Sequence, residues 1–288
     1  MFKRMQQKWG VTARQFGIIF LVFGLTGTTT ALLTRYITAW LGMDTDTYWL
    51  WKLLLRIGML LLGYQFILLL YGALLGQWAF FWKYEKRLLQ KLGIVRRTKQ
   101  IAVFASGAGS NAEKIILYFK NHPSIKVKLV VCNKPGAGVI RIAQNQGIPV
   151  LLIERDPFFR GDSYLPYLKE QGINFIVLAG FLWKIPDALV AAYPKKILNI
   201  HPALLPDYGG KGMYGIRVHE AVIAAGVKES GISIHLVDEH FDEGEIIFQA
   251  KCTIGENETP QSLAEKVHKL EHRHYPEVVE KWIQAGRV

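Results

Sequence analysis

The chain has few cysteines and no obvious metal motif built on them. Its 288 residues include two cysteines, Cys132 and Cys252, and neither has the spacing of a metal-ligand pair or a paired framework. Each lies in an apolar run typical of a strand, so we expect both side chains to be buried and reduced. That expectation fits a reducing compartment such as the cytosol for the second half of the chain.

Acidic residues are also scarce in the first third of the chain. Residues 1–97 contain 13 Lys or Arg and 3 Asp or Glu, whereas residues 98–288 contain 22 and 20, so most of the formal charge of +12 is at the N-terminal end. A basic excess can indicate nucleic-acid binding. Here it flanks apolar stretches, which favours membrane topology, and we expect no nucleic-acid partner.

Two uncharged stretches are long enough to cross a bilayer, which requires roughly 20 apolar residues in a helix. They run from 15 to 34 and from 57 to 82. Glycine and a run of threonines dilute the first stretch, and such small residues let helices pack closely in lipid. Two alternatives are a buried helical hairpin of a soluble protein and a cleaved signal peptide. A small-residue cleavage site is missing and a second span follows, which disfavours the signal peptide.

The flanking charges predict an orientation. Positive residues stay on the cytoplasmic side, so we expect both termini and the C-terminal domain to be cytoplasmic, with the protein in the inner (cytoplasmic) membrane. The segment from 83 to 99 would be a basic linker on anionic headgroups. The charges concerned are Lys3, Arg4, Lys8 and Arg14 before the first span, Lys83, Lys86, Arg87, Lys91, Arg96, Arg97 and Lys99 after the second, and Asp44, Asp46 and Lys52 between them.

From about residue 98 the pattern changes to short apolar runs alternating with helical periodicity. Near-continuous apolar strands of this kind predict an α/β fold with an open, mostly parallel sheet and helices on both faces. Two last strands joined by a turn suggest an antiparallel edge, and Thr259-Pro260 predicts a helix start. The expected strands are 101–105, 126–132, 149–153, 175–179, 197–200, 231–237 and 246–254, with helices from 111, over 162–171 and over 214–225.

A glycine-rich turn follows the first predicted strand, reading Ser-Gly-Ala-Gly-Ser-Asn over 106–111. Free backbone N–H groups at a helix N-terminus attract an anion, so Gly109, Ser110 and Asn111 are candidates for phosphate binding, with an ordinary strand-to-helix turn as the alternative. A dinucleotide fingerprint needs a third glycine where Ala112 stands and an acidic residue after the second strand, where Asn133-Lys134 follows. NAD binding is therefore disfavoured.

Polar residues gather at the end of the fifth predicted strand. Asn199 and His201 are two apart on an extended chain and point to the same side, and an acidic loop containing Asp242 follows downstream. An amide and an imidazole can stabilise an oxyanion and move protons during acyl transfer to an amine. A carboxylate nearby would raise the pKa of the histidine. A lone histidine can also be structural, and His235 and His240 lack the partners of a zinc site.

Four segments together carry a family resemblance: S-G-A-G-S-N, V-L-A-G-F-L, L-N-I-H-P-A-L-L-P and D-E-G-E-I-I-F-Q-A. In this order, over roughly 190 residues, they resemble the folate-dependent phosphoribosylglycinamide (glycinamide ribonucleotide) formyltransferases of purine (IMP) biosynthesis. The resemblance implies a formyltransferase domain over 98–288, behind a two-span transmembrane hairpin with its basic linker over 1–97. It also implies 10-formyltetrahydrofolate as formyl donor, glycinamide ribonucleotide as acceptor and no metal.

The resemblance also implies roles for individual residues. Asn199, His201 and Asp242 match a catalytic trio in which Asn199 holds the formyl oxygen and Asp242 keeps His201 charged. Gly109, Ser110 and Asn111 match the phosphate loop, and Glu271 matches a contact to the ribonucleotide. The folate-lining positions that match are Arg160, Leu182, Trp183, Lys184 and Ile185, together with Asn199.

Two other functions share these residues. A formyltetrahydrofolate hydrolase uses the same Asn, His and Asp, although that family has a soluble regulatory domain at its N-terminus. A catalytically retired domain on a functional membrane module is the third possibility, which the intact trio disfavours. The sequence carries no indication of the oligomeric state.

Overall fold

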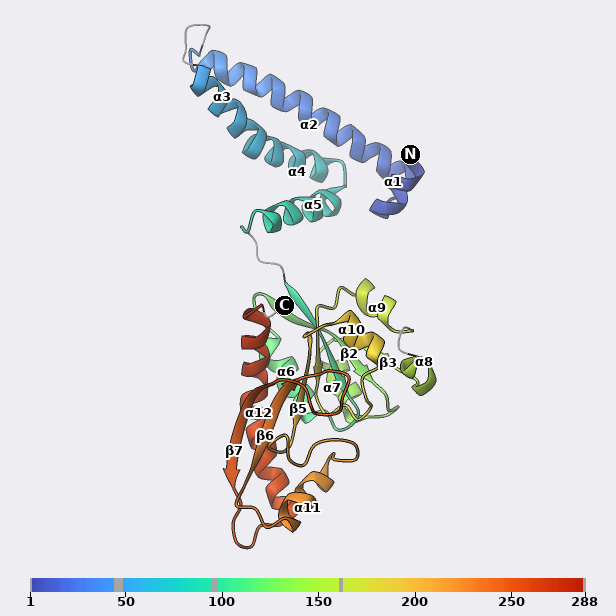
Figure 1. Ribbon diagram of the computed structural model, residues 1–288. Coiled ribbons are helices and arrows are strands. Elements are labelled where there is room, and N and C mark those ends of the chain that lie inside the picture. The colour runs from blue at the N-terminus through green and yellow to red at the C-terminus, as the bar shows by residue number, and fades with distance from the viewer. Residues whose placement is uncertain (1, 44–48, 95–97, 161–162, 287–288) are drawn as a thin grey trace. The chain divides into compact units, whose positions relative to one another are not determined.

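The computed structural model describes residues 2–43, 49–94, 98–160 and 163–286, and its chain forms two compact units, Met1–Arg97 and Thr98–Val288 (Figure 1). Each unit has hydrophobic clusters of its own. The predictions above that involve Asp44, Asp46, Arg96, Arg97 and Asp162 lie outside the described residues.

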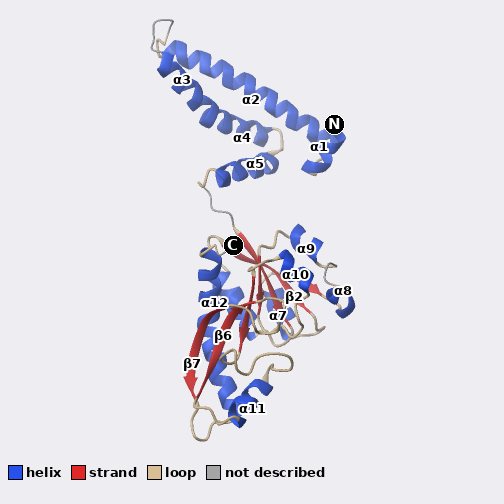
Figure 2. Ribbon diagram, viewed as in Figure 1, coloured by secondary structure: helices blue, strands red, loops and turns tan. Residues whose placement is uncertain are grey.

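The C-terminal unit is built on one seven-stranded sheet in the order β3-β2-β1-β4-β5-β6-β7 (Figure 2). β1 to β5 are parallel, and β6 is antiparallel to both β5 and β7. This confirms the open, mostly parallel sheet and its antiparallel edge. The strands are β1 (Lys99–Ala105), β2 (Ile125–Cys132), β3 (Val150–Leu152), β4 (Phe175–Leu178), β5 (Ile197–His201), β6 (Glu229–Leu236) and β7 (Ile246–Thr253).

Helices cover both faces of the sheet because the buried strands are apolar on both sides. In β1, Ile101 and Val103 pack into one cluster, whereas Ala102 and Phe104 pack into the other. Alternate residues of a strand point to opposite faces, so the two clusters are the two sides of one sheet. The first side is covered by α6 (Ser110–Phe119), α7 (Gly138–Asn145), α11 (Ile216–Ala224) and α12 (Pro260–Gln284), and the second by α8 (Arg155–Phe159), α9 (Leu165–Glu170) and α10 (Asp187–Ala192).

The long helix α12 packs against one face of the sheet and contacts its strands. It begins as predicted at Thr259-Pro260, where the Thr259 hydroxyl accepts from Ser262 N–H at 3.2 Å in a capping box. Farther along, the buried Tyr275 hydroxyl lies 2.8 Å from the carbonyl oxygen of Leu178 and 3.2 Å from that of Leu198. One side chain therefore connects α12 to the last residue of β4 and to the second residue of β5, directly before Asn199.

The N-terminal unit consists of helices alone in its described part. Two of them are long and apolar enough to cross a membrane: α2 (Ala13–Trp40), and the continuous helix Trp49–Leu74 formed by α3 (Trp49–Gly58), the π-helical η1 (Met59–Gly63) and α4 (Tyr64–Leu74). Ile19, Val22 and Leu68 are fully buried between them, together with Phe81 of α5 (Trp78–Lys91). The short α1 (Phe2–Trp9) precedes α2.

The second apolar helix does not have the predicted bounds of 57–82. It begins earlier, so that Lys52 and Arg56 belong to it, and it ends at Leu74. Gly76 then adopts φ +68, and Gln77 N–H donates to Gly72 C=O at 2.6 Å. A left-handed glycine with this bonding pattern terminates a helix whatever the polarity of the next residues. The prediction was based on the absence of charge up to residue 82, and it therefore extended beyond the actual end of the helix.

The two cysteines differ in exposure. Cys132, in the central strand β2, is fully buried, as expected. Cys252 is only partly buried, which corrects the expectation for that residue. It lies in β7, the edge strand, whose side chains are packed less completely than those of the central strands.

Gly231 is a test of the close pairing of β6 with β7. A Cβ at this position would lie 1.9 Å from the carbonyl oxygen of Ala250, so Gly231→Ala must move backbone. We expect a loss of about 3 kcal/mol or more in the free energy of unfolding and a fall of about 6 °C or more in the thermal midpoint. Gly255→Ala, where a Cβ would only touch Glu258 at 3.7 Å, is the control, and equal midpoints would contradict the steric argument.

Candidate active site

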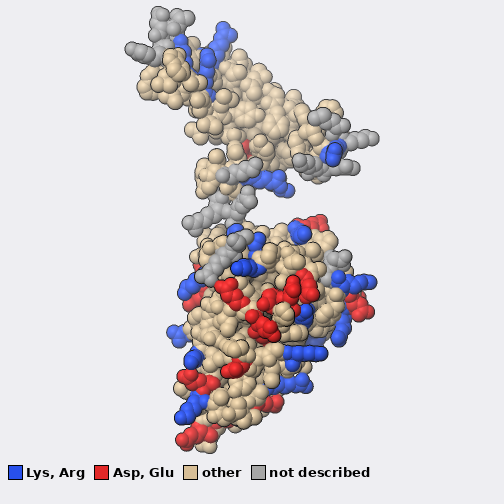
Figure 3. Space-filling model, viewed as in Figure 1, with Lys and Arg blue, Asp and Glu red and all other residues tan. Residues whose placement is uncertain are grey.

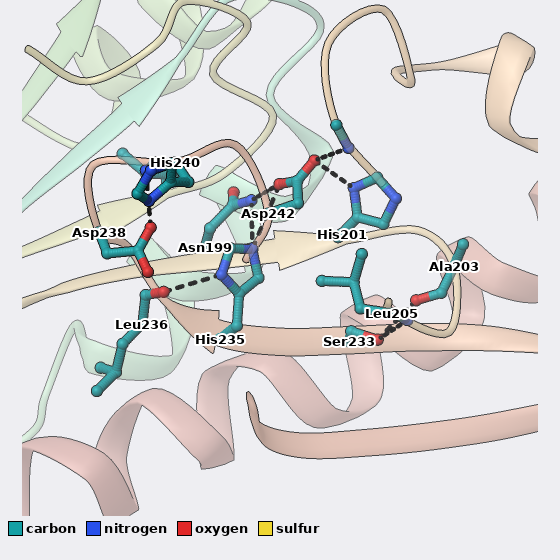
Figure 4. Close-up of polar contacts among 12 residues, drawn as sticks. Asn199, His201, Ala203, Leu205, Ser233, His235, Leu236, Asp238, His240 and Asp242 are labelled. Carbon is teal, nitrogen blue, oxygen red and sulfur yellow. Dashed lines mark hydrogen bonds and ion pairs between the residues drawn. The ribbon is translucent and has the colours of Figure 1, made fainter. Parts of the chain in front are cut away.

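Two functional side chains come from the end of β5. Asn199 and His201 lie on the same side of the strand, as expected from their spacing, and Figure 4 shows both directed toward Asp242. His201 is 3% exposed, although it is a polar residue at a strand end. Its Nε2 lies 2.8 Å from the carbonyl oxygen of Tyr208, so this nitrogen carries a proton and donates.

A third side chain, His235, completes the group and was not among the predicted site residues. β6 pairs antiparallel with β5, and the register places His235 directly opposite Asn199. Its Nε2 is 3.1 Å from Asn199 Nδ2 and 3.4 Å from Asp242 Oδ1, while its Nδ1–H donates to the Leu236 carbonyl at 2.9 Å. Aligning β5 with β6 from Asn199 would have identified it, because directly paired residues share a face of the sheet.

The loop after β6 carries Asp242 back over the strand ends. Asp242 has φ +59, a left-handed conformation that aspartate tolerates better than most residues. The loop is closed by Leu236 N–H, which donates to Glu245 C=O at 2.9 Å, and a Cβ on Gly244 would lie 1.8 Å from the Leu236 carbonyl oxygen. Only glycine therefore fits at position 244, where the two ends of the loop come together, and this closure determines the direction of the Asp242 side chain.

Groups from three segments surround the Asp242 carboxylate. Burial alone would raise its pKa, but its contact with His235, the proximity of His201 and the Gly210 N–H bond at 3.0 Å act together to lower it below the ordinary value. A group with its pKa lowered in this way remains ionised throughout the neutral range. The site therefore contains a fixed negative charge that is 13% exposed.

His201 does not have the raised pKa that a neighbouring carboxylate predicts. Burial lowers its pKa, and this outweighs the opposing effects of Asp242 and of the Tyr208 carbonyl. Nδ1 of His201 lies 3.5 Å from Asp242 Oδ2, longer than the 2.7–2.9 Å of a charge-assisted bond. In this structure burial thus favours the neutral form of His201, contrary to the expectation that Asp242 keeps it charged.

Asn199 is held by its amide nitrogen. Nδ2 donates one hydrogen to His235 Nε2 at 3.1 Å and the other to Asp242 Oδ1 at 3.4 Å. Both neighbours are acceptors here, since His235 carries its proton on Nδ1, and this assigns the orientation of the amide. The longer of the two bonds is the weaker, so a ligand oxygen can replace Asp242 as acceptor with little loss.

The predicted phosphate cradle forms at the end of β1. Gly109 has φ +87 at the N-cap of α6, and a Cβ there would lie 2.8 Å from both Cα and Cβ of Val139. A glycine is thus required for conformation and for space. The turn leaves the exposed Ser110 at the N-terminus of α6, which is the geometry of an anion site.

Glu271 of α12 lies beside this cradle. Asn111 Nδ2 donates to its Oε2 at 2.8 Å, and the glutamate is 4% exposed. Burial raises the pKa of Glu271, against the opposing effects of Asn111 and His268. The structure therefore brings together the predicted phosphate loop and the predicted ribonucleotide contact, which are 160 residues apart in sequence.

The helix α11 contributes a further buried histidine. His219 is 3% exposed, and its Nδ1 has no hydrogen-bond partner among the described residues. Burial, followed by His268 and His201, lowers its pKa to about 4.

Of the predicted folate positions, Asn199 belongs to the trio, and Trp183 belongs to an aromatic cluster. Trp183 packs against Phe158 and Phe159 of α8, with ring centroids 5.7 Å apart in both pairs, and Arg160 follows them as an exposed residue. Among the described residues, no hydrogen bond or ion pair joins this cluster to the trio. Of the remaining positions, Leu182 is 52% exposed, Lys184 pairs with Asp187 at 3.2 Å, and Ile185 is 3% exposed within the core.

Comparison with known proteins covers both units. A family model described as "Formyl transferase" matches residues 99–279, and one described as "Family of unknown function (DUF6787)" matches residues 18–96. The second match spans most of α2, the second apolar helix and α5.

Named relatives match the C-terminal unit. The chloroplastic phosphoribosylglycinamide formyltransferase of Arabidopsis thaliana is 44% identical over 195 residues, 64% of this chain and 65% of that protein. The chain thus spans slightly less than two thirds of that relative. The Bacillus subtilis (strain 168) phosphoribosylglycinamide formyltransferase is 39% identical over 186 residues, 63% of this chain and 93% of that protein.

A solved structure agrees with these matches. Glycinamide ribonucleotide transformylase 1 from Geobacillus kaustophilus superimposes with a TM-score of 0.58 at 37% identity, covering 63% of this chain and 97% of that one. The region matched by the formyl transferase model, residues 99–279, contains the whole seven-stranded sheet and every side chain of the site described above. Through its C-terminal unit the chain belongs to the formyl transferase family.

Proposed function

We propose that this protein transfers a formyl group from 10-formyltetrahydrofolate to the amine of glycinamide ribonucleotide, in purine synthesis. The observation that carries the proposal is the placement of Asn199, His201 and Asp242 at the same edge of the sheet as an anion cradle, since β5 and β1 are parallel and both pair with β4. That pairing fits an acceptor with a phosphate at one end and an amine at the other. The named relatives support the same substrates.

The reaction needs proton movement and charge stabilisation. The amine nitrogen bonds to the formyl carbon, the bond from that carbon to N10 of the folate breaks, and the proton released by the amine ends on N10. Negative charge develops on the formyl oxygen between these events. Catalysis therefore needs a donor for that oxygen and a group that can take up and return one proton.

His201 suits the proton transfer because it starts neutral. Once it is protonated, its two N–H groups have acceptors already in place, the Tyr208 carbonyl at Nε2 and Asp242 at Nδ1. Charge on His201 is then stabilised by the fixed carboxylate. In this scheme Asp242 stabilises the imidazolium after proton uptake, and does not hold it charged beforehand.

Asn199 suits the oxyanion. Its amide nitrogen is kept at the strand end by His235, while the longer bond to Asp242 can be exchanged for one to the formyl oxygen. His235 is thus a positioning residue: its Nε2 accepts from Asn199, and its Nδ1–H is anchored to the Leu236 carbonyl. Such preorganised donors are a large contribution to acyl-transfer catalysis.

Substrate recognition divides between the two remaining groups. Gly109, Ser110 and Asn111 receive the phosphate at the N-terminus of α6, and Glu271 faces the same ribonucleotide from α12. The folate is assigned to the Trp183 cluster and its neighbours. Trp183 offers an aromatic face and Arg160 a cation to a folate, which has a pterin ring and an acidic tail.

We propose further that the N-terminal unit anchors the enzyme in the inner (cytoplasmic) membrane. Both long helices expose large apolar side chains, including Leu60, Leu61, Leu62 and Phe66 at 61–76%. Exposure of this kind is costly in water but favourable in lipid. In Figure 3 the visible middle of this unit is almost free of Lys, Arg, Asp and Glu, as a hydrocarbon layer requires.

The helix α5 fits the membrane surface. Its Phe81 is fully buried against Gly72 of α4, where a Cβ would lie 2.8 Å from the Phe81 ring. On its other side Trp78 and Trp82 stack at 5.7 Å and remain 47% and 46% exposed. Exposed tryptophans on a basic helix are typical of the headgroup region, so α5 takes the role predicted for the basic linker.

Formyl transfer can be measured as release of tetrahydrofolate by the detergent-solubilised full chain. We expect release only when glycinamide ribonucleotide is present, because its amine is the nucleophile. His201→Ala should lower turnover by about 100-fold or more, through loss of the proton acceptor. His240→Ala, an exposed histidine on the neighbouring loop, is the matched control and should be nearly neutral.

The assay also separates the alternatives. Release without the ribonucleotide identifies a formyltetrahydrofolate hydrolase, and no release in either case identifies a retired domain. Normal turnover of His201→Ala would refute the role of that residue.

The coupling between Asp242 and His201 predicts a change in pH dependence. In Asp242→Asn the carboxylate that opposes the burial effect is lost, so the pKa of His201 should fall further. The acidic limb of the kcat profile should then move to lower pH, with a loss of about tenfold or more in maximal kcat. Asp238→Asn, on the same loop, should leave the limb in place, and an unmoved limb in Asp242→Asn would contradict the coupling.

The orientation can be tested by cysteine labelling in a Cys252→Ser background. Leu41→Cys, at the end of α2, should react with a membrane-impermeant maleimide added outside intact cells. Ile94→Cys, after α5, should react only when the cells are permeabilised. Leu41 is 47% exposed and Ile94 68% exposed, so access to the reagent is not limited by packing. The reverse labelling pattern would invert the topology.

A further inference from the structure

A second polar hollow lies at the other end of the sheet from the proposed active site. It has a volume of about 270 Å³ and is lined at the starts of β1 and β4 and at the ends of α9 and α10. Its polar lining consists of Lys99, Lys169, Asn174, Tyr193 and Lys196. β1 runs seven residues from Lys99 to Ala105 before the phosphate cradle begins, roughly 20 Å at the rise of a strand. The hollow is therefore separate from the cradle.

The charge of the hollow has one sign. Three of its lining residues are lysines and none is Asp or Glu. In the described part of the chain none of the three lysines forms an ion pair, and Lys99 Nζ lies 5.9 Å from the centroid of the Phe175 ring. Three like charges around one cavity repel one another, so their convergence is favourable once an anion occupies the space.

The lysines are not needed to complete the two helices that end here. At α9 the Lys169 carbonyl accepts from Gly172 N–H at 3.0 Å. Beyond α10 the Tyr193 carbonyl accepts from Lys196 N–H at 2.9 Å. These carbonyls are satisfied by backbone, and helices of six residues have little dipole for a lysine to complement.

Tyr193 provides an independent indication of a ligand. It lines the hollow, it is 5% exposed, and its hydroxyl has no hydrogen-bond partner among the described residues. Burial raises the pKa of this hydroxyl, so it keeps its proton and can donate. A buried donor without an acceptor is costly, and an oxygen atom of a bound anion would remove that cost.

Asn174 adds a further donor. Its Oδ1 accepts from Gln100 N–H at 2.8 Å, which fixes the amide and leaves its NH2 group for another acceptor. Donors thus surround the hollow: three ammonium groups, one hydroxyl and one amide. A phosphate group matches this set, since it has up to two negative charges and several strong acceptor oxygens.

We propose that this hollow binds a phosphate group through Lys99, Lys169 and Lys196, with Tyr193 as an additional donor. The phosphate belongs either to a soluble phosphate compound or to a phospholipid headgroup, since the basic helix α5 ends at Lys91, eight residues before Lys99. The proposal does not depend on the formyl-transfer reaction, because none of these residues belongs to the active site.

Hydrogen–deuterium exchange of the full chain in nanodiscs can locate the ligand. One arm adds 20 mM inorganic phosphate to phosphatidylcholine nanodiscs, and the other replaces part of the lipid with phosphatidic acid. We expect exchange in the segments 168–176 and 192–198 to slow by about threefold or more in at least one arm. Slowing with inorganic phosphate identifies a soluble source, and slowing only with phosphatidic acid identifies a headgroup.

Matched variants decide whether the hollow is responsible. Lys99→Gln, Lys169→Gln and Lys196→Gln combined should abolish the slowing. Lys128→Gln, Lys228→Gln and Lys269→Gln combined, which remove the same charge from exposed positions elsewhere, should retain it. Unchanged exchange of β6 and β7 shows that each variant is folded. Absence of slowing in both arms, or slowing that survives in the first variant, overturns the proposal.

Tyr193→Phe separates a ligand role from a packing role. Without phosphate the variant should be at least as stable as the wild type, because it removes an unpaired buried hydroxyl. With a ligand, half-saturation should need about fivefold more phosphate or phosphatidic acid, the loss of one hydrogen bond. A variant that is destabilised and binds normally would show that the hydroxyl serves packing alone.

Discussion

The active site depends on the pairing of β5 with β6. The strands β1 to β5 are parallel, and each contributes only its own side chains where it ends. The antiparallel partner brings His235 opposite Asn199 and then returns the chain as a narrow loop over the same edge. Asp242 is buried only because that loop closes at Gly244, and the properties of Asn199 and His201 follow from the charge placed there.

The placement of Asp242 in the site costs folding free energy, because its carboxylate is largely removed from water. A buried carboxylate is expensive unless several donors compensate it. Here the donors are Gly210 N–H and the Asn199 amide, and the two histidines lie within 3.5 Å of the carboxylate without donating to it in their neutral forms. The group that costs most to bury is consequently the one that organises the rest of the site.

Much of the C-terminal fold could be predicted from the sequence because its strands are apolar on both sides and sharply bounded. Asn199, His201 and the cradle could be located because they lie at the ends of predicted strands, and Asp242 was assigned through the family resemblance. His235 was missed because its role depends on a pairing between strands more than 30 residues apart. The neutral state of His201 was missed because burial, which the sequence does not reveal, outweighs the nearby charge. The second apolar helix was misplaced for a local reason, the left-handed Gly76.

The amide of Asn199 has a consequence for selectivity. Both of its hydrogens are already engaged without substrate, so a neutral carbonyl that arrives must displace an existing acceptor and gains little by doing so. An oxygen bearing a full negative charge competes far better for the same hydrogen. The hydrogen bonds that Asn199 makes without substrate therefore weaken binding of the unreacted formyl donor. The strongest hydrogen bond from Asn199 forms with the oxyanion of the tetrahedral intermediate.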